Sequence, residues 1–259
     1  MALLLSKSPH INAAGLVEYN ELCYIGLRQN SMTGAVLKSA RLNANLTQQE
    51  AASMLGLTQA YLSMVERGHR PVTSGLATQA TEAFDLPPTA LPLEPEDSLL
   101  WNEEELKSGL GALGYPGFAY LRGKPRRNPA QLLFHALNQS DLDARVVEAL
   151  PWLTCTYTDM DWEWLARNAR LNDRQNRLGF VVALAEELAR NAGDPRRSKN
   201  LAEYRASLDR SRLVREDTLC HDSMTQAERK WLQQNRPPEA GHWNLLTDLD
   251  VKHLAYGSA

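Results

Sequence analysis

With 259 residues, 43% of them hydrophobic and 23% charged, the chain has the composition of a soluble globular protein and is long enough for two domains. Its formal net charge of −3 excludes an overall basic field as the basis for binding nucleic acid. No run approaches the roughly 18 apolar residues of a membrane span, so we expect no membrane partner. The three cysteines, Cys23, Cys155 and Cys220, are scattered along the chain, which favours reduced thiols in a cytoplasmic protein.

Residues 1–32 carry no strong pattern and are interpreted as an N-terminal arm that is either disordered or packed at the periphery. Leu16, Val17 and Leu22 supply enough apolar character for a short helix. Because Met32 stands just before the next predicted helix, the sequence leaves open whether this arm belongs to the native protein.

The first well-patterned element is a helix predicted over residues 34–43. Leu37 and Ala40 are three residues apart, which places them on one face for the core, and Val36 and Leu42 are further apolar candidates.

Residues 46–68 contain the signals of two short helices joined by a turn. Thr47 with Glu50 three residues later forms a capping box that begins the first helix, and Gly56 ends it. Thr58 caps the second helix and Gly68 closes it. The expected inward residues are Ala51, Ala52, Leu55, Leu62 and Val65. Two short helices around a glycine-containing turn are typical of a DNA-reading unit, whereas an ordinary amphipathic hairpin is the alternative.

The outward side chains of the second short helix are the candidate base contacts. The amide of Gln59 can both donate to and accept from adenine, while Ala60 and Met64 can contact thymine methyl groups. Helix N-termini and arginine side chains favour phosphates. The predicted DNA-binding residues are Gln48, Thr58, Gln59, Ala60, Ser63, Met64, Arg67 and Arg70.

The joint spacing of these residues resembles the Cro/phage-repressor class of helix-turn-helix, also called the XRE family, over about residues 34–92. The matching residues are Gln48, Glu50, Ala51, Ala52, Gly56, Leu57, Leu62, Ser63, Glu66, Gly68 and Pro71. The resemblance implies a five-helix, lambda-repressor-like domain, which we place at residues 33–92. It also implies that Arg41 on the first helix pairs with Glu66 at the end of the recognition helix, in a structural role.

The predicted DNA-binding domain has little net charge. It carries Lys38, Arg41, Arg67 and Arg70 against Glu50, Glu66, Glu82 and Asp85. Because the non-specific electrostatic contribution is then weak, we expect a homodimer, which doubles the contacts with a double-stranded operator. After the turn at residues 69–71, Thr73 or Ser74 caps a fourth helix through Phe84, and a last helical turn ends near Leu91.

Residues 93–127 are predicted to be a linker. It begins with prolines and a run of acidic residues. Residues 109–114 match the G-x-G-x-x-G motif, but they lack the preceding strand that a dinucleotide-binding site needs. We therefore interpret these glycines as a flexible turn. Residues 118–121 are expected to be briefly extended. The densest basic cluster of the chain follows, and it allows a second phosphate contact: Arg122, Lys124, Arg126 and Arg127.

Residues 128–259 are predicted to form a helical dimerisation or partner domain. Asn128 and Pro129 begin one helix, a break is expected at Pro151, and Asp161 and Asp173 each open another helix. The helix after Asp173 is apolar over most of its circumference, so it should be buried in a bundle or a dimer interface. A loop at residues 194–198, a helix at 201–208, an irregular stretch at 214–223 and a capping box of Thr225 with Glu228 complete the pattern.

The sequence therefore predicts a mainly α protein and no enzyme. It contains no nucleophile–base motif, no phosphate loop and no zinc spacing; Cys220–His221 lacks a second ligand pair, and we expect neither cofactor nor metal. The carboxylates at 159, 161 and 163 are better explained by capping. We expect a transcriptional regulator, most simply a repressor, with an oligomerisation or sensing domain. The alternative is an antitoxin that autoregulates its operon and neutralises a toxin enzyme, which rests on family association alone.

Overall fold

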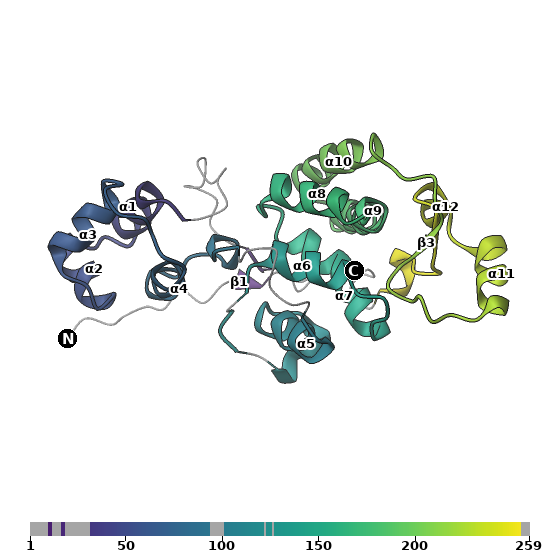
Figure 1. The fold of residues 1–259 in the computed structure, drawn as a ribbon, viewed down its shortest axis with the longest axis horizontal. Helices are drawn as coiled ribbons and strands as arrows, with labels where there is room; N and C mark the ends of the chain where they lie inside the picture. Colours follow the sequence, from purple (N-terminus) through teal and green to yellow (C-terminus); the bar gives the residue numbers. More distant parts are fainter. Residues whose placement is uncertain are drawn as a thin grey trace.

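A computed structural model describes residues 32–93, 101–121, 123–125 and 127–254, together with the backbone of residues 10–11 and 17–18. These residues are mainly helical, which confirms the predicted fold class (Figure 1). We call residues 32–93 the head and residues 101–254 the body. The buried apolar side chains form one cluster in the head, a larger one in the body and a small third one around Leu232.

The head contains four helices and a final 3-10 turn, as the resemblance implied. They are α1 (Gly34–Asn43), α2 (Gln48–Met54), α3 (Gln59–Glu66), α4 (Ser74–Ala83) and η1 (Pro88–Ala90). The body contains α5 (Glu103–Ala112), η2 (Pro116–Leu121), α6 (Pro129–Leu137), α7 (Ala144–Thr156), α8 (Trp162–Leu171), α9 (Gln175–Asn191), α10 (Pro195–Asp209), α11 (Gln226–Asn235), α12 (Pro238–His242) and η3 (Val251–His253).

Strands are short among the described residues. β1 (His10–Ile11) and β2 (Val17–Glu18) pair antiparallel, with His10 opposite Glu18, and β3 (Asp217–Thr218) and β4 (Leu245–Leu246) pair parallel. The short helix predicted in residues 1–32 is wrong at Val17, which lies in β2, and the rest of that prediction lies outside the described residues.

Each of the four head helices begins at a threonine. The Oγ1 atoms of Thr33, Thr47, Thr58 and Thr73 accept hydrogen bonds of 3.2–3.3 Å from the third backbone N–H of their helix. Between these caps the predicted inward side chains are buried, with Leu37, Ala51, Leu62, Val65 and Ala80 fully enclosed. The prediction for Leu42 is wrong, because this side chain is 53% exposed at the end of α1.

A glycine sets the distance between the first and third helices of the head. A Cβ atom on Gly34 would lie 1.9 Å from the carbonyl oxygen of Val65, which no side chain can occupy. The start of α1 therefore packs directly on the backbone of α3 at Val65. This contact holds α3 on the side that faces the head core.

The body is organised around α9, which packs against α7, α8, α10, α12 and η3. The side chains of Leu178, Phe180, Val181, Val182 and Ala185 of α9 are fully enclosed. Of the two predicted settings, a bundle or a dimer interface, the structure shows the bundle. Near its start, Arg177 is also completely buried. Its guanidinium forms two hydrogen bonds to Asp217, of 2.9 and 3.0 Å, and donates to the carbonyls of Leu137 and Gln139.

The linker predicted at residues 93–127 is wrong over much of its length. α5 and η2 lie within it, and Leu106, Leu110 and Phe118 are enclosed in the body core. The glycines interpreted as a flexible turn are mostly helical, since Gly109 and Gly111 lie within α5. A Cβ on Gly111 would meet the carbonyl oxygen of Phe118 at 2.7 Å, so this glycine allows α5 and η2 to pack closely. The segment expected to be extended is the second half of η2.

Three predicted helix boundaries in the body are also wrong. α7 continues through Pro151 instead of breaking there. The predicted loop at residues 194–198 is the start of α10, where Asp194 caps the helix and Pro195 takes its first position, as proline readily does. Asp173 does not cap α9 as predicted. It has a positive φ of 55°, and Arg174 is the residue that directly precedes the helix. The caps at Asn128, Asp161 and Thr225 are confirmed.

No helix among the described residues is both long and apolar enough to cross a membrane.

We expect Gly179→Ala to destabilise the body. A Cβ at this position would lie 2.2 Å from the fully buried ring of Trp243, and overpacking of this kind costs roughly 1–3 kcal/mol. All six tryptophans lie at or beyond residue 101, so urea unfolding followed by tryptophan fluorescence reports on the body. Gly241→Ala, with its nearest atom at 3.7 Å, is the matched control and should not be destabilised. Equal stability of both variants would contradict the packing described for α9.

Candidate nucleic-acid interface

The turn between α2 and α3 is built by the signals found in the sequence. The N–H of Glu50 donates to Thr47 Oγ1 at 3.2 Å, and the N–H of Thr47 donates to Glu50 Oε2 at 2.8 Å, which completes the capping box. The N–H of Thr47 and its hydroxyl, which donates to Glu50 Oε2 at 2.7 Å, together lower the pKa of the Glu50 carboxyl. Gly56 then has a φ of +64°, and the N–H of Leu57 reaches back to the carbonyl of Ala52. This left-handed glycine reverses the chain so that α3 follows at once.

α3 has an enclosed face and an open face. Leu62 and Val65 point into the head core and are fully buried. Gln59 and Ala60 are exposed, Met64 is 38% exposed, and Ser63 is half-buried between them. The division between inward and outward side chains is the one that the spacing predicted.

A buried ion pair connects α1 to the end of α3. Arg41 Nε donates to Glu66 Oε1 at 2.6 Å, Arg41 Nη2 donates to Glu66 Oε2 at 3.1 Å, and the exposed fractions of the two side chains are 7% and 1%. Arg41 Nη1 also donates to the carbonyl of Leu46 at 2.7 Å. The pair implied by the family resemblance is therefore present, and it faces the interior of the head.

Gln48 belongs to the same polar network. Its Nε2 atom donates to Glu66 Oε2 at 2.9 Å, so the side chain at the start of α2 supports the C-terminal end of α3. The side-chain amide has this structural partner, and contact between Gln48 and DNA stays a prediction.

The electrostatics of Glu66 result from two opposing effects. Burial alone would raise the pKa of its carboxyl, but the hydrogen bonds from Arg41 and Gln48 and the charge of Arg41 outweigh burial and lower the pKa. The carboxylate is therefore held ionised inside the head, with three donated hydrogen bonds satisfying its oxygens.

The remaining predicted contacts lie at the ends of α3. Thr58 is exposed at its N-terminus, Arg67 is exposed at its C-cap, and Arg70 is exposed in the following loop. Glu82, one of the acidic residues of the head, forms an ion pair with Lys124 of the body. This pair offsets one negative charge of the head.

The other charged groups singled out in the sequence serve the local structure. Asp161 caps α8, and Asp159 accepts a hydrogen bond from Thr89. Of the basic cluster, Lys124 pairs with Glu82 and Arg127 lies 4.6 Å above the centre of the Trp101 ring, while Arg122 and Arg126 fall outside the described residues.

Among the described residues, no group of three histidine, cysteine, aspartate or glutamate side chains is arranged to hold a metal ion. Cys155 and Cys220 are buried free thiols, and burial raises the pKa of each to about 11, which makes the reactive thiolate scarce at neutral pH. Cys23 lies outside the described part of the chain.

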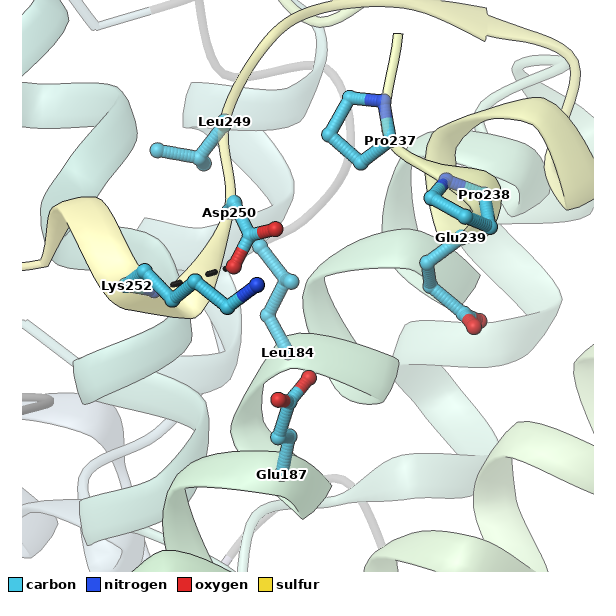
Figure 2. Close-up of a pocket in the computed structure, with 8 residues that line it drawn as sticks. All are labelled: Leu184, Glu187, Pro237, Pro238, Glu239, Leu249, Asp250 and Lys252. Atoms are coloured by element: carbon cyan, nitrogen blue, oxygen red, sulfur yellow. Dashed lines mark hydrogen bonds between the residues drawn. The ribbon is translucent and has the colours of Figure 1, made fainter.

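The body has a shallow pocket of about 220 Å³ between α9, α12 and η3 (Figure 2). Two of its carboxylates already have partners within the chain. Asp250 accepts a hydrogen bond from the N–H of Lys252 at 3.0 Å, and Glu239 accepts one from Trp243 Nε1 at 3.0 Å. Its lining consists of Leu184, Glu187, Pro237, Pro238, Glu239, Leu249, Asp250 and Lys252.

Two residues that support α3 were missed by the sequence reasoning. Gly34 was seen only as the start of a helix, although small size at a helix start is the signal for close packing. Gln48 was assigned to DNA, although its position one residue after a cap also suits a contact with a neighbouring helix.

Residues 37–91 match the family model described as Helix-turn-helix. The match begins at the first core residue of α1 and ends just after η1, so it covers the head and leaves the body unassigned. Searches of curated proteins and of solved structures found no match.

We expect Glu66→Ala to destabilise the head strongly. The substitution leaves Arg41 buried without its partner, and breaking a buried pair in this way costs about 3–5 kcal/mol. Hydrogen exchange at the amides of Leu62 and Val65 measures the opening of the head. A double variant, Arg41→Met with Glu66→Leu, removes both charges and should regain most of the loss. If Glu66→Ala leaves exchange unchanged, the pair does not hold α3 in place.

The stabilising effect of Glu66 should depend on pH. Because the pKa of Glu66 is lower in the folded head than in the unfolded chain, its contribution is complete above an unfolded pKa of about 4.3 and is lost as pH falls through the folded value. The difference in head stability between the wild type and Glu66→Gln should therefore be constant near neutral pH and shrink in acid. A difference that grows in acid would contradict the direction of this shift.

Proposed function

We propose that this protein, a DNA-binding transcription regulator of the XRE/Cro helix-turn-helix type, is a sequence-specific repressor that binds a two-fold operator as a homodimer. Each head would supply one copy of α3 to one half of the operator, and the bodies would hold the two chains together. The observation that carries the proposal is the open face of α3, where Gln59, Ala60 and Met64 are exposed.

The position of α3 in the molecule supports this role. Figure 1 shows α2 and α3 at one end of the molecule, with α4 between them and the body. The major groove admits an α-helix whose N-terminal side chains reach the base edges. Because the body lies on the other side of α4, it leaves this face of the head accessible to a duplex.

The chemistry of the face indicates what it would read. Gln59, at the first position of α3, would pair with the N6 and N7 atoms of an adenine, and Ala60 and Met64 would contact thymine methyl groups. Ser63 can hydrogen bond to either kind of base edge. The proposed half-site therefore contains A·T pairs opposite these side chains.

Phosphate contacts would fix the register of α3 in the groove. The exposed N-terminus at Thr58 directs backbone N–H groups outward, and Arg67 and Arg70 add positive charge beyond its C-terminal end. These groups lie at opposite ends of α3, so they would contact the backbone on both sides of the groove.

The homodimer is proposed from the weakness of a single head. Few phosphate contacts give a small electrostatic contribution to affinity, whereas two linked heads bind half-sites one helical turn, or a multiple of it, apart. The body leaves Leu171, Val214 and Trp231 exposed, and Val214 is 92% exposed. Large apolar side chains of this kind are suitable for burial between two copies of the chain.

In the antitoxin alternative, the head would regulate the protein's own operon. The body would bind and neutralise a toxin enzyme. The same exposed apolar side chains of the body favour a protein partner without identifying it. Co-expression with the product of the neighbouring gene separates the two functions. A stable complex that relieves growth arrest supports the antitoxin, and a head that binds the operator with no such complex supports the repressor.

We expect Gln59→Ala to weaken binding to an operator selected from a random DNA library. Losing a bidentate contact with adenine costs about 1–3 kcal/mol and relaxes the preference at that base pair. Fluorescence anisotropy at fixed salt concentration gives both the affinity and the number of chains per operator.

Gln79→Ala is the control, because Gln79 is exposed on α4 and lies outside the proposed interface. This variant should bind like the wild type. Equal affinity of the wild type and Gln59→Ala for every operator would remove Gln59 from the interface, and one chain per operator would refute the dimer.

A further inference from the structure

The head and the body meet at a small set of polar contacts that we call the joint. It consists of Glu82, Thr89 and Leu91 from the head side and Lys124, Asn128 and Asp159 from the body side. We propose that the joint holds the head in one orientation on the body, and that Asn128 is a positioning residue for DNA recognition by α3.

The side-chain amide of Asn128 caps a helix of the body with its oxygen and binds the head with its nitrogen. Its Oδ1 atom accepts a hydrogen bond of 2.9 Å from the N–H of Ala130 and so caps α6. Its Nδ2 atom donates to the carbonyls of Thr89 and Leu91, at 3.1 and 2.7 Å, and so fastens the end of the head. The side chain is buried, with 3% exposed; its hydrogen bonds to Leu91 and Ala130 are buried, and the one to Thr89 is partly buried.

The orientation of this amide follows from its neighbours. Rotation by 180° would place Oδ1 against two carbonyl oxygens and Nδ2 against an N–H, so all three hydrogen bonds would be lost together. The joint therefore has one satisfactory arrangement, and it requires the head carbonyls at their observed positions.

Two further contacts, both exposed to solvent, join the head to the body. Thr89 Oγ1 donates to Asp159 Oδ2 at 2.6 Å, and Lys124 forms an ion pair with Glu82 at the end of α4. Asp159 lies between α7 and α8, whereas Lys124 lies before α6, so the head is held from two separate parts of the body. On the head, these contacts lie at two places, Thr89 with Leu91 and Glu82, and together they oppose rotation of the head about either place.

The chain itself passes from one core to the other at the joint. Ala90 belongs to the core of the head, and Leu93, three residues later, packs against the core of the body. η1 is therefore anchored on both sides. Because α3 is fixed within the head by Arg41 and Gly34, an orientation imposed on η1 is carried to the recognition helix.

The consequence for DNA binding rests on the proposed homodimer. If the bodies join two chains, rigid joints fix the distance and angle between the two copies of α3. The operator is then selected by the spacing of its half-sites as well as by the bases within each of them.

The decisive variant is Asn128→Asp. Aspartate retains an oxygen that caps α6, but it replaces the amide donor with a second oxygen facing two carbonyls. Asn235→Asp is the matched control, because Asn235 Nδ2 also donates to a carbonyl, at the exposed end of α11 and away from the joint. If Asn128→Asp does not fold, Thr89→Val removes the hydroxyl that donates to Asp159, with Thr78→Val as its control on α4.

Backbone ¹⁵N relaxation of the full chain tests the joint without DNA. We expect head and body amides of the wild type and of Asn235→Asp to share one rotational correlation time. In Asn128→Asp, or in Thr89→Val, the head should tumble faster than the body. A head that already tumbles independently in the wild type, or that stays coupled in both joint variants, would overturn the proposal.

A series of operators with altered half-site spacing tests the positioning role. A change of two base pairs rotates one half-site by about a fifth of a helical turn, so wild-type affinity should fall on the order of tenfold. The joint variant should lose this spacing preference while binding a single half-site like the wild type. An unchanged spacing profile in a variant with a mobile head would refute positioning. Failure of the wild type to bind any operator selected from the DNA library would refute the proposed function and leave the relaxation result standing.

Discussion

The buried pair of Arg41 and Glu66 is the interaction on which the proposed DNA-binding face depends. Both charges lie out of solvent, so each requires the other, and Gln48 completes the hydrogen bonding of the carboxylate. Together they join the first three helices of the head near the C-terminal end of α3. Gly34 fixes the same helix from behind through its backbone. The open face of α3 can consist of small and flexible side chains because its position is set by these inward contacts.

In the proposed function, the head recognises DNA and the body joins the two chains. The head consists of short helices with threonine caps, and α3 exposes a few of its side chains to solvent. The C-terminal end of the head, after α4, contacts the body at the joint. The body has its own core around α9 and holds the buried guanidinium of Arg177 within it. Under this proposal, the outer residues of α3 would select the bases of each half-site, and the body would set the spacing between half-sites.

Much of the head could be predicted from the sequence because its signals are local. The capping box at Thr47, the left-handed Gly56 and the inward residues Leu62 and Val65 each depend on neighbours within a few positions. The body was less predictable because tertiary packing outweighs local signals there. Pro151 remains inside α7, and the glycines of α5 serve close packing with η2. The joint could not be predicted, because the carbonyls that Asn128 binds are visible only after folding.

Binding of the open face of α3 to the bases of an operator, as proposed, can be tested directly. The methyl group of Met64 is a direct probe of that face, and ¹³C-methyl NMR of methionine can follow it during titration with the selected operator. We expect a large shift of the Met64 methyl signal, with the signals of the buried methionines Met160 and Met224 unchanged. A specific complex in which the Met64 signal does not move would contradict the proposal.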